Sequence, residues 1–198
     1  MNACGEVFAR DISDILSRRE RTAIEHPSFL RAAVIVPLFK KEGNCHILLT
    51  RRTDRVKYHK GQISFPGGGF DEDDADLKRT ALRETFEEIG VCEKDIRVLG
   101  ILDDVVTISQ FVVTPYVAIF PYPYPFHVSP IEIDELVEVP LATLLSPECF
   151  GKKEIVDDGL KKIVDSYHYK QYTIWGATAR ILKQFLDLLP ESLLSEGL

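Results

Sequence analysis

The sequence has few features of a membrane-spanning or secreted protein. No apolar run approaches the roughly 18 residues that a membrane-spanning helix requires. The opening segment, MNACGEVFARDISD, carries acidic residues where a signal peptide has its apolar core. The four cysteines (Cys4, Cys45, Cys92 and Cys149) are far apart and form no CxxC pair. We therefore expect no membrane partner, no zinc site and no disulfide framework, and a location in the reducing cytoplasm.

The chain also lacks the basic excess that is typical of nucleic-acid-binding proteins. It has 31 Asp and Glu residues against 24 Lys and Arg, which gives a formal net charge of −7. This charge argues against nucleic acid as a partner, although a local basic patch can still hold a phosphate. Low-complexity tracts, internal repeats and linkers are absent, and 45% of the residues are hydrophobic. These features predict one globular domain over residues 1–198.

The spacing of apolar residues predicts a mixture of strands and helices. Strands are expected near 31–39, 45–50, 62–65, 96–103, 110–120 and 133–139. Helices are expected near 8–21, 75–89 and 174–189, with a short one after Pro140. Residues 66–69 (PGGG) are expected to form a turn, and Gly90 to end the second helix. The order does not alternate strand and helix regularly, which favours the α+β class.

Three carboxylates share one face of the helix expected at 75–89. Glu84, Glu87 and Glu88 stand at positions i, i+3 and i+4, and Arg83 alone cannot neutralise them. A hard divalent cation such as Mg²⁺ or Mn²⁺ prefers oxygen ligands and would remove the repulsion. A solvated acidic face is the alternative interpretation. An EF-hand is excluded, because the loop starting at Asp71 would need glycine where Asp76 stands.

A basic stretch lies shortly before the carboxylates. Five of the chain's basic residues fall within positions 51–60, together with His59: Arg51, Arg52, Arg55, Lys57 and Lys60. In an acidic protein, such a stretch beside a metal-binding helix indicates a small substrate rich in phosphate. A solvated edge strand and loop is the alternative.

The segment Gly67–Val91 resembles the Nudix box, G-x5-E-x7-R-E-U-x-E-E-x-G-U, in which U is a bulky aliphatic residue. Residues 83–91 (RETFEEIGV) match every charged and glycine position, and Thr85 stands where an aliphatic residue is usual. In the first half, Asp74 follows Gly68 at the spacing of the first acid, but eight residues instead of seven separate it from Arg83. Reading the box from Gly69 places Ala75 in that slot.

The resemblance implies a Nudix fold, an α/β/α sandwich with a mixed central sheet. Its core would cover about residues 31–189, with residues 1–30 as a helical extension. It also implies that Glu87 and Glu88 bind Mg²⁺ or Mn²⁺, and that Glu84 is a third ligand or the base that activates water. Arg83 would orient this set, and the carbonyl of Gly67 would add a ligand.

Residues 48–68 resemble the signature of the coenzyme A diphosphatase branch of this family, LLTxR, a small residue, x3, R, x3, G, x3, FPGG. Thr53 fills the position of the small residue, and Lys57 replaces the second arginine. The resemblance implies hydrolysis of coenzyme A or its thioesters to 3′,5′-ADP and the 4′-phosphopantetheine portion. The substrate-binding residues expected here are Arg52, Arg55, Lys57, His59, Gly61, Phe65 and Gly68.

Other functions stay open at this point. Family members share the box, so ADP-ribose, a dinucleotide or a nucleoside triphosphate is an alternative substrate. A non-catalytic binding module is disfavoured because all three box glutamates are present. Glu132 is either a surface charge or a group near the metal site. The sequence does not decide between a monomer and a homodimer.

Overall fold

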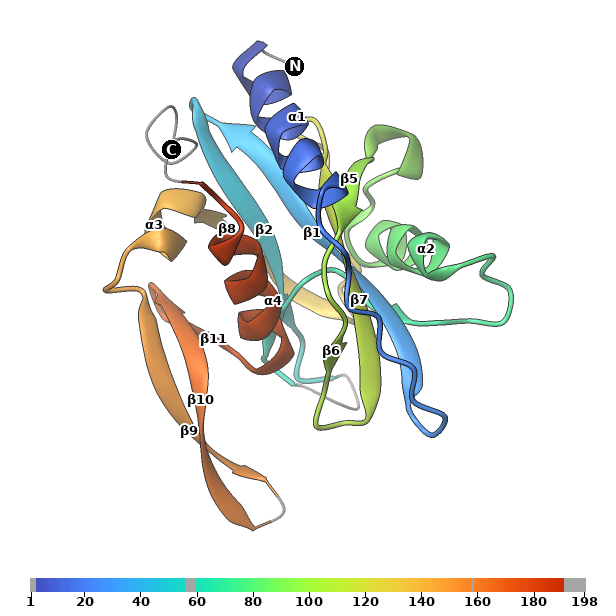
Figure 1. Ribbon diagram of the computed structural model, residues 1–198, viewed down its shortest axis with the longest axis vertical. Coiled ribbons are helices and arrows are strands. Elements are labelled where there is room, and N and C mark those ends of the chain that lie inside the picture. The colour runs from blue at the N-terminus through green and yellow to red at the C-terminus, as the bar shows by residue number, and fades with distance from the viewer. Residues whose placement is uncertain (1–2, 56–59, 158, 191–198) are drawn as a thin grey trace.

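The computed structural model describes residues 3–55, 60–157 and 159–190 (Figure 1). Its helices are α1 (Ala3–Ser17), α2 (Leu77–Ile89), α3 (Leu141–Leu145) and α4 (Gly176–Asp187), with a 3₁₀ helix, η1 (Glu93–Asp95). Its strands are β1 (Leu30–Lys41), β2 (Asn44–Arg52), β3 (Ile63–Ser64), β4 (Gly67–Gly69), β5 (Arg97–Ile101), β6 (Val105–Val106), β7 (Phe111–Ile119), β8 (Ile133–Pro140), β9 (Phe150–Asp157), β10 (Leu160–Tyr169) and β11 (Tyr172–Trp175). None of the helices in these ranges is both long and apolar enough to cross a bilayer.

The main sheet is mixed and is built around β1. Its strand order is β3-β2-β1-β7-β5, while β4 pairs with β1, β6 with β7 and β8 with β2. The β1–β7 pair is parallel and the other pairs are antiparallel. Strand β1 is apolar almost throughout, because alternate residues of a strand point to opposite faces and both faces of this one are covered.

Helices cover the two faces of this sheet. On one face, Leu77 and Ala81 of α2 pack with Ala33 and Ile35 of β1. On the other face, α1 and α4 pack over alternate residues of β1 such as Val36 and form the main core, and Figure 1 shows these two helices in front of the sheet. The result is an α/β/α sandwich with a mixed central sheet, which confirms the expected fold class.

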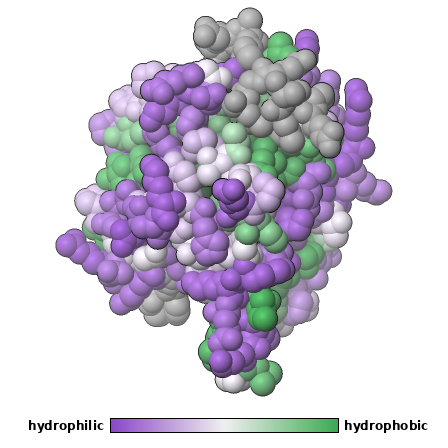
Figure 2. Space-filling view, turned by 90° about the vertical axis from the view of Figure 1, so that its left-hand side faces the viewer, coloured by the Kyte–Doolittle hydropathy of each residue, from purple (hydrophilic) through white to green (hydrophobic). Residues whose placement is uncertain are grey.

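The sequence missed a second, three-stranded antiparallel sheet with the order β11-β10-β9. Its β9–β10 hairpin projects away from the main sheet (Figure 1) and bears apolar side chains among charged ones (Figure 2). Val156, Leu160 and Ile163 are each more than 60% exposed there. A strand that is half-buried in a core has alternating apolar residues, and charged residues interrupt this alternation in β9 and β10. The sequence pattern therefore did not predict these strands.

Two other expectations differ from the structure. Residues 67–69 are a short strand, β4, that pairs with Ala32–Val34 of β1, and not only a turn. The expected helix over 8–21 is α1 at Ala3–Ser17, and the chain from 18 to 29 forms no helix. Residues 18–29 instead form ion pairs with the connection between β5 and β6. Arg19 pairs with Asp103 at 2.6 Å, and Arg21 pairs with buried Asp104 at 2.8 Å. Side-chain pairs between distant segments leave no periodic signal in a sequence.

Candidate active site

Helix α2 has a defined start and end. At its start, the side chain of Asp76 accepts a hydrogen bond from the backbone N–H of Arg79 at 2.8 Å, which satisfies one free donor of the first turn. At its end, Gly90 adopts a left-handed conformation with φ of 76°. A Cβ added there would lie 2.7 Å from the Cβ of His127, so glycine is needed for both reasons. The helix expected to end at Gly90 is therefore confirmed, and its register fixes the direction of the glutamates.

Glu88 is the most deeply buried of the three box carboxylates, with 1% of the residue exposed. Its Oε2 accepts a hydrogen bond from the backbone N–H of Gly67 at 3.2 Å. Its Oε1 accepts one from Nη1 of Arg52, also at 3.2 Å. Burial raises the pKa of Glu88 to about 8, against the lowering effects of Arg52 and the Gly67 N–H, and the charges of Glu84 and Glu132 raise it further.

Glu84 lies directly against the backbone of β4. A Cβ added to Gly68 would lie 2.3 Å from the Cδ of Glu84, so any larger residue there would displace this carboxylate. Burial raises the pKa of Glu84, while the Arg83 guanidinium, 2.7 Å away, opposes that shift. Glu87 is more open, with 53% of its side chain exposed, and it contacts the same guanidinium at 3.2 Å.

Asp74 holds Arg83 in place. The Nε and Nη2 of Arg83 donate to the two carboxylate oxygens of Asp74 at 3.0 and 2.9 Å, and Thr80 donates to Asp74 at 2.8 Å. The arginine hydrogen bonds hold the pKa of this buried carboxyl well below its usual range, and the same contact raises the pKa of Arg83. Asp74, which follows Gly68 at the spacing of the first box acid, is thus the main hydrogen-bonding partner of the box arginine.

The loop at 121–132 fixes the carboxyl end of α2. The N–H groups of His127 and Ser129 donate to the carbonyls of Ile89 and Glu88 at 3.1 and 2.9 Å. The same loop ends beside β2, where the N–H of Thr53 donates to the carbonyl of Glu132 at 2.8 Å. Glu132 is therefore near enough for its charge to raise the pKa values of Glu84 and Glu88. The sequence did not reveal this clamp, because it is made by backbone groups.

The expected substrate-binding residues are in different settings. Arg52 faces Glu88, and Gly68 faces Glu84. Gly61 has a φ of 65° and donates its N–H to the carbonyl of Arg52 at 3.1 Å, so it shapes the turn. Phe65 differs from the expectation: it is 2% exposed and packs in the main core, so its side chain is not available to contact a substrate. The exposed Arg55 follows β2. Lys57 and His59 lie outside the described residues.

The oxygen donors of this site fit a hard divalent cation. The charge of Glu132 raises the pKa values of Glu84 and Glu88, and the charge of Glu84 raises that of Glu88 further, so a positive charge beside them is favourable. Within 3–55, 60–157 and 159–190, however, no three His, Cys, Asp or Glu side chains converge as a ready metal-binding group. The contacts explain this arrangement, since Arg83 holds Glu84 and Glu87, whereas Arg52 holds Glu88.

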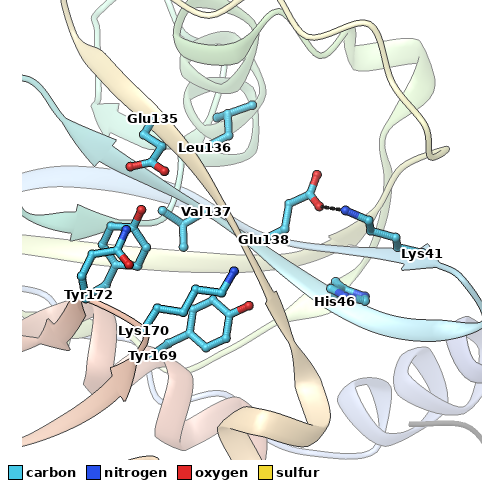
Figure 3. Close-up of a pocket in the computed structure, with 10 residues that line it drawn as sticks. Lys41, His46, Glu135, Leu136, Val137, Glu138, Tyr169, Lys170 and Tyr172 are labelled. Atoms are coloured by element: carbon cyan, nitrogen blue, oxygen red, sulfur yellow. Dashed lines mark hydrogen bonds and ion pairs between the residues drawn. The ribbon is translucent and has the colours of Figure 1, made fainter.

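A separate hollow of about 330 Å³ lies between the free edge of β8 and the β10–β11 turn (Figure 3). None of the box glutamates lines it. Two of its charged groups already neutralise each other, because Lys41 and Glu138 pair at 2.6 Å. No residue lining this hollow has a buried side-chain N or O atom without a hydrogen-bond partner. The carboxylate cluster, and not this hollow, is therefore the candidate active site.

Comparison with known proteins agrees with this geometry. Residues 29–155 match the NUDIX domain. The chain belongs to the NUDIX family. It is 34% identical to a protein of Enterobacter sp. (strain 638) named "Uncharacterized Nudix hydrolase NudL", over 86% of this chain and 83% of that protein. It is 37% identical to a protein of the same name from Photorhabdus laumondii, over 77% of this chain and 81% of that one.

A solved structure supports the same assignment of the fold. The crystal structure of a MutT/nudix family protein from Enterococcus faecalis superposes with a TM-score of 0.57, at 16% identity, over 95% of this chain and 74% of that one. The family match and the curated relatives identify this NUDIX protein as a hydrolase that acts on diphosphate bonds.

The Asp74–Arg83 pair should contribute measurably to stability. Asp74→Asn keeps the shape of the side chain but leaves the guanidinium without its counter-charge. We expect the free energy of unfolding to fall by about 2 kcal/mol in urea denaturation, less than for a fully buried pair because Arg83 is 24% exposed. Exposed Asp73→Asn is the matched control and should change stability by less than about 0.5 kcal/mol. Equal stabilities of the two variants would contradict the anchoring role.

Glu88 should make the metal-free protein less stable as the pH rises. Its folded-state pKa of about 8 lies above the ordinary value of 4.5, so the folded state binds the proton more tightly than the unfolded state. Stability is therefore lost progressively between these two values. Thermal melts in EDTA should show the wild-type melting temperature falling relative to that of Glu88→Gln across this window. A constant difference between the two proteins would show that Glu88 does not titrate there.

Proposed function

We propose that this NUDIX hydrolase is a divalent-metal-dependent diphosphatase of coenzyme A or its thioesters. The observation that supports this most strongly is the contact between Arg52 and Glu88. Arg52 belongs to the LLTxR segment that resembles the coenzyme A branch, whereas Glu88 belongs to the box. The two residues are 36 positions apart in sequence, and their side chains meet at 3.2 Å. A phosphate-binding group and a metal-binding group thus belong to one site.

The residues proposed to hold Mg²⁺ or Mn²⁺ are Glu84, Glu87, Glu88 and the carbonyl of Gly67. When bound, the cation would offset the negative charge that develops on the diphosphate oxygens. Glu84 has a raised pKa and is proposed to take the proton of the attacking water. Arg83, fixed by Asp74, is proposed to keep Glu84 and Glu87 in position.

The reaction proposed is an attack by water oxygen on one phosphorus of the diphosphate. The bond from that phosphorus to the bridging oxygen breaks, and the other phosphate leaves with the bridging oxygen. Glu132 is proposed as a further acidic group near this step, because its charge acts on both Glu84 and Glu88. Products from coenzyme A would be 3′,5′-ADP and 4′-phosphopantetheine.

Substrate selection is proposed to depend on the basic segment at 51–60. Coenzyme A carries a 3′-phosphate beyond its diphosphate, so cations additional to the metal are useful. Arg52 lies at the carboxylates and Arg55 is exposed just beyond β2. Lys57 and His59 stay predictions. We also propose that the protein acts in the cytoplasm and that residues 1–198 are one domain.

Product analysis tests this proposal directly. Incubation with coenzyme A and Mn²⁺ should yield 3′,5′-ADP on ion-exchange chromatography, at a higher rate than the hydrolysis of ADP-ribose, dinucleotides or nucleoside triphosphates. Glu88→Gln should cut turnover by orders of magnitude while the circular dichroism spectrum stays unchanged. The exposed Glu72→Gln should leave turnover unchanged. Faster hydrolysis of ADP-ribose would contradict the substrate, and wild-type turnover by Glu88→Gln would contradict the metal-binding role.

A further inference from the structure

The guanidinium of Arg52 is incompletely satisfied. Its Nη1 donates to Glu88 at 3.2 Å, while its Nε is buried and has no hydrogen-bond partner. Among the described residues, only one other buried side-chain nitrogen or oxygen, Nε of Arg21, shares this condition. A buried donor without a partner destabilises the folded state. Such a cost is understandable where the group has a second partner in another state of the protein.

The other arginines near the site do not share this property. Arg83 is fixed by two hydrogen bonds to Asp74 and a third to the carbonyl of Gly69 at 3.2 Å. Arg51, the neighbour of Arg52 in β2, pairs instead with Asp134 at 3.2 Å. Arg52 has a single contact of 3.2 Å to Glu88, whereas Arg83 makes two shorter hydrogen bonds to Asp74. Of the two arginines that contact the box glutamates, Arg52 is therefore the more easily released.

The partner of Arg52 is also the carboxylate that a divalent cation would need most. Both oxygens of Glu88 are occupied, one by Arg52 and one by the Gly67 N–H. A cation that approaches Glu88 therefore meets the positive charge of Arg52. Two cations at this carboxylate repel each other, and this repulsion favours displacement of Arg52.

We propose that Arg52 is an exchangeable partner of Glu88, which holds this carboxyl group in the metal-free protein and turns its Nε edge to a substrate phosphate when a divalent cation takes its place. This inference rests on the metal site of the proposed function. Metal binding releases a phosphate-binding group, and phosphate binding frees a metal ligand. By linkage, each ligand then strengthens the binding of the other by the same factor. Arg52 is thus a positioning residue for the metal as well as a substrate contact.

Calorimetric titration with Mg²⁺ alone tests the exchange. The titration is made above the pKa of Glu88, about 8, so that protons do not compete. Arg52→Gln should bind Mg²⁺ at least about threefold more tightly than wild type, a difference of about 0.6 kcal/mol. Arg51→Gln removes the same charge one residue away and should bind like wild type. Unchanged or weaker binding by Arg52→Gln, or equal tightening in Arg51→Gln, would overturn the proposal.

A second measurement covers the case in which Arg52→Gln does not fold. The Nε–H resonance of Arg52 in the wild-type protein, assigned with Arg52→Lys, should shift when Mg²⁺ is added. It should move downfield when 3′,5′-ADP follows, because the N–H then donates to a phosphate. A resonance that neither addition moves would contradict the exchange. Neither experiment requires turnover, so failure to hydrolyse coenzyme A would refute the substrate and leave the exchange standing.

Discussion

The structure around α2 depends on neutralising carboxylates that the fold removes from water. An isolated buried carboxylate is expensive, and the cost falls only when a cation or several hydrogen bonds accompany it. This chain meets the requirement with two arginines. Arg83 neutralises Asp74 with two hydrogen bonds and also contacts Glu84 and Glu87, whereas Arg52 donates a hydrogen bond to Glu88. The two arginines have different consequences, because one is fixed firmly and the other is not.

The rest of the fold places these charges. Strand β4 has no side chains, so the backbone of Gly67 and Gly68 can lie against Glu88 and Glu84. Pairing of β4 with β1 fixes that backbone to the centre of the main sheet. The N–H groups of the 121–132 loop bind the carbonyls at the carboxyl end of α2. The carboxyl half of the helix is thus held by this loop and by the backbone of β4, which contacts two of its glutamates.

Much of the fold could be predicted from the sequence, because strands buried on both faces and helices with capping residues leave local patterns. The strands around 31–50, the helix that ends at Gly90 and the layered architecture belong to this class. The β9–β10 hairpin could not be predicted, since it projects into solvent and its charged residues interrupt the alternation. The path of residues 18–29 depends on distant partners such as Asp104, which a local pattern does not contain.

The candidate site could be predicted in its composition but not in its pairing. Spacing identified Glu84, Glu87 and Glu88 as one face, and the structure places Glu88 deepest. The sequence left the role of Asp74 open, because one inserted residue shifts the box. The contact between Arg52 and Glu88 joins two motifs that are 36 positions apart, and no local pattern in the sequence contains it. Phe65 was expected to bind substrate because it belongs to the segment at 48–68 that resembles the coenzyme A signature. In the structure its side chain is part of the core instead.

The central claim is that Glu88 binds a divalent cation, and that Arg52 occupies the position of this cation when no metal is bound. The most direct test is a crystal structure of the protein soaked with Mn²⁺, with data collected near the manganese absorption edge. The account predicts an anomalous peak within coordination distance of the Glu88 carboxylate, and an Arg52 guanidinium that has left it. A peak elsewhere, or Arg52 still hydrogen-bonded to Glu88 beside a bound ion, would contradict the account.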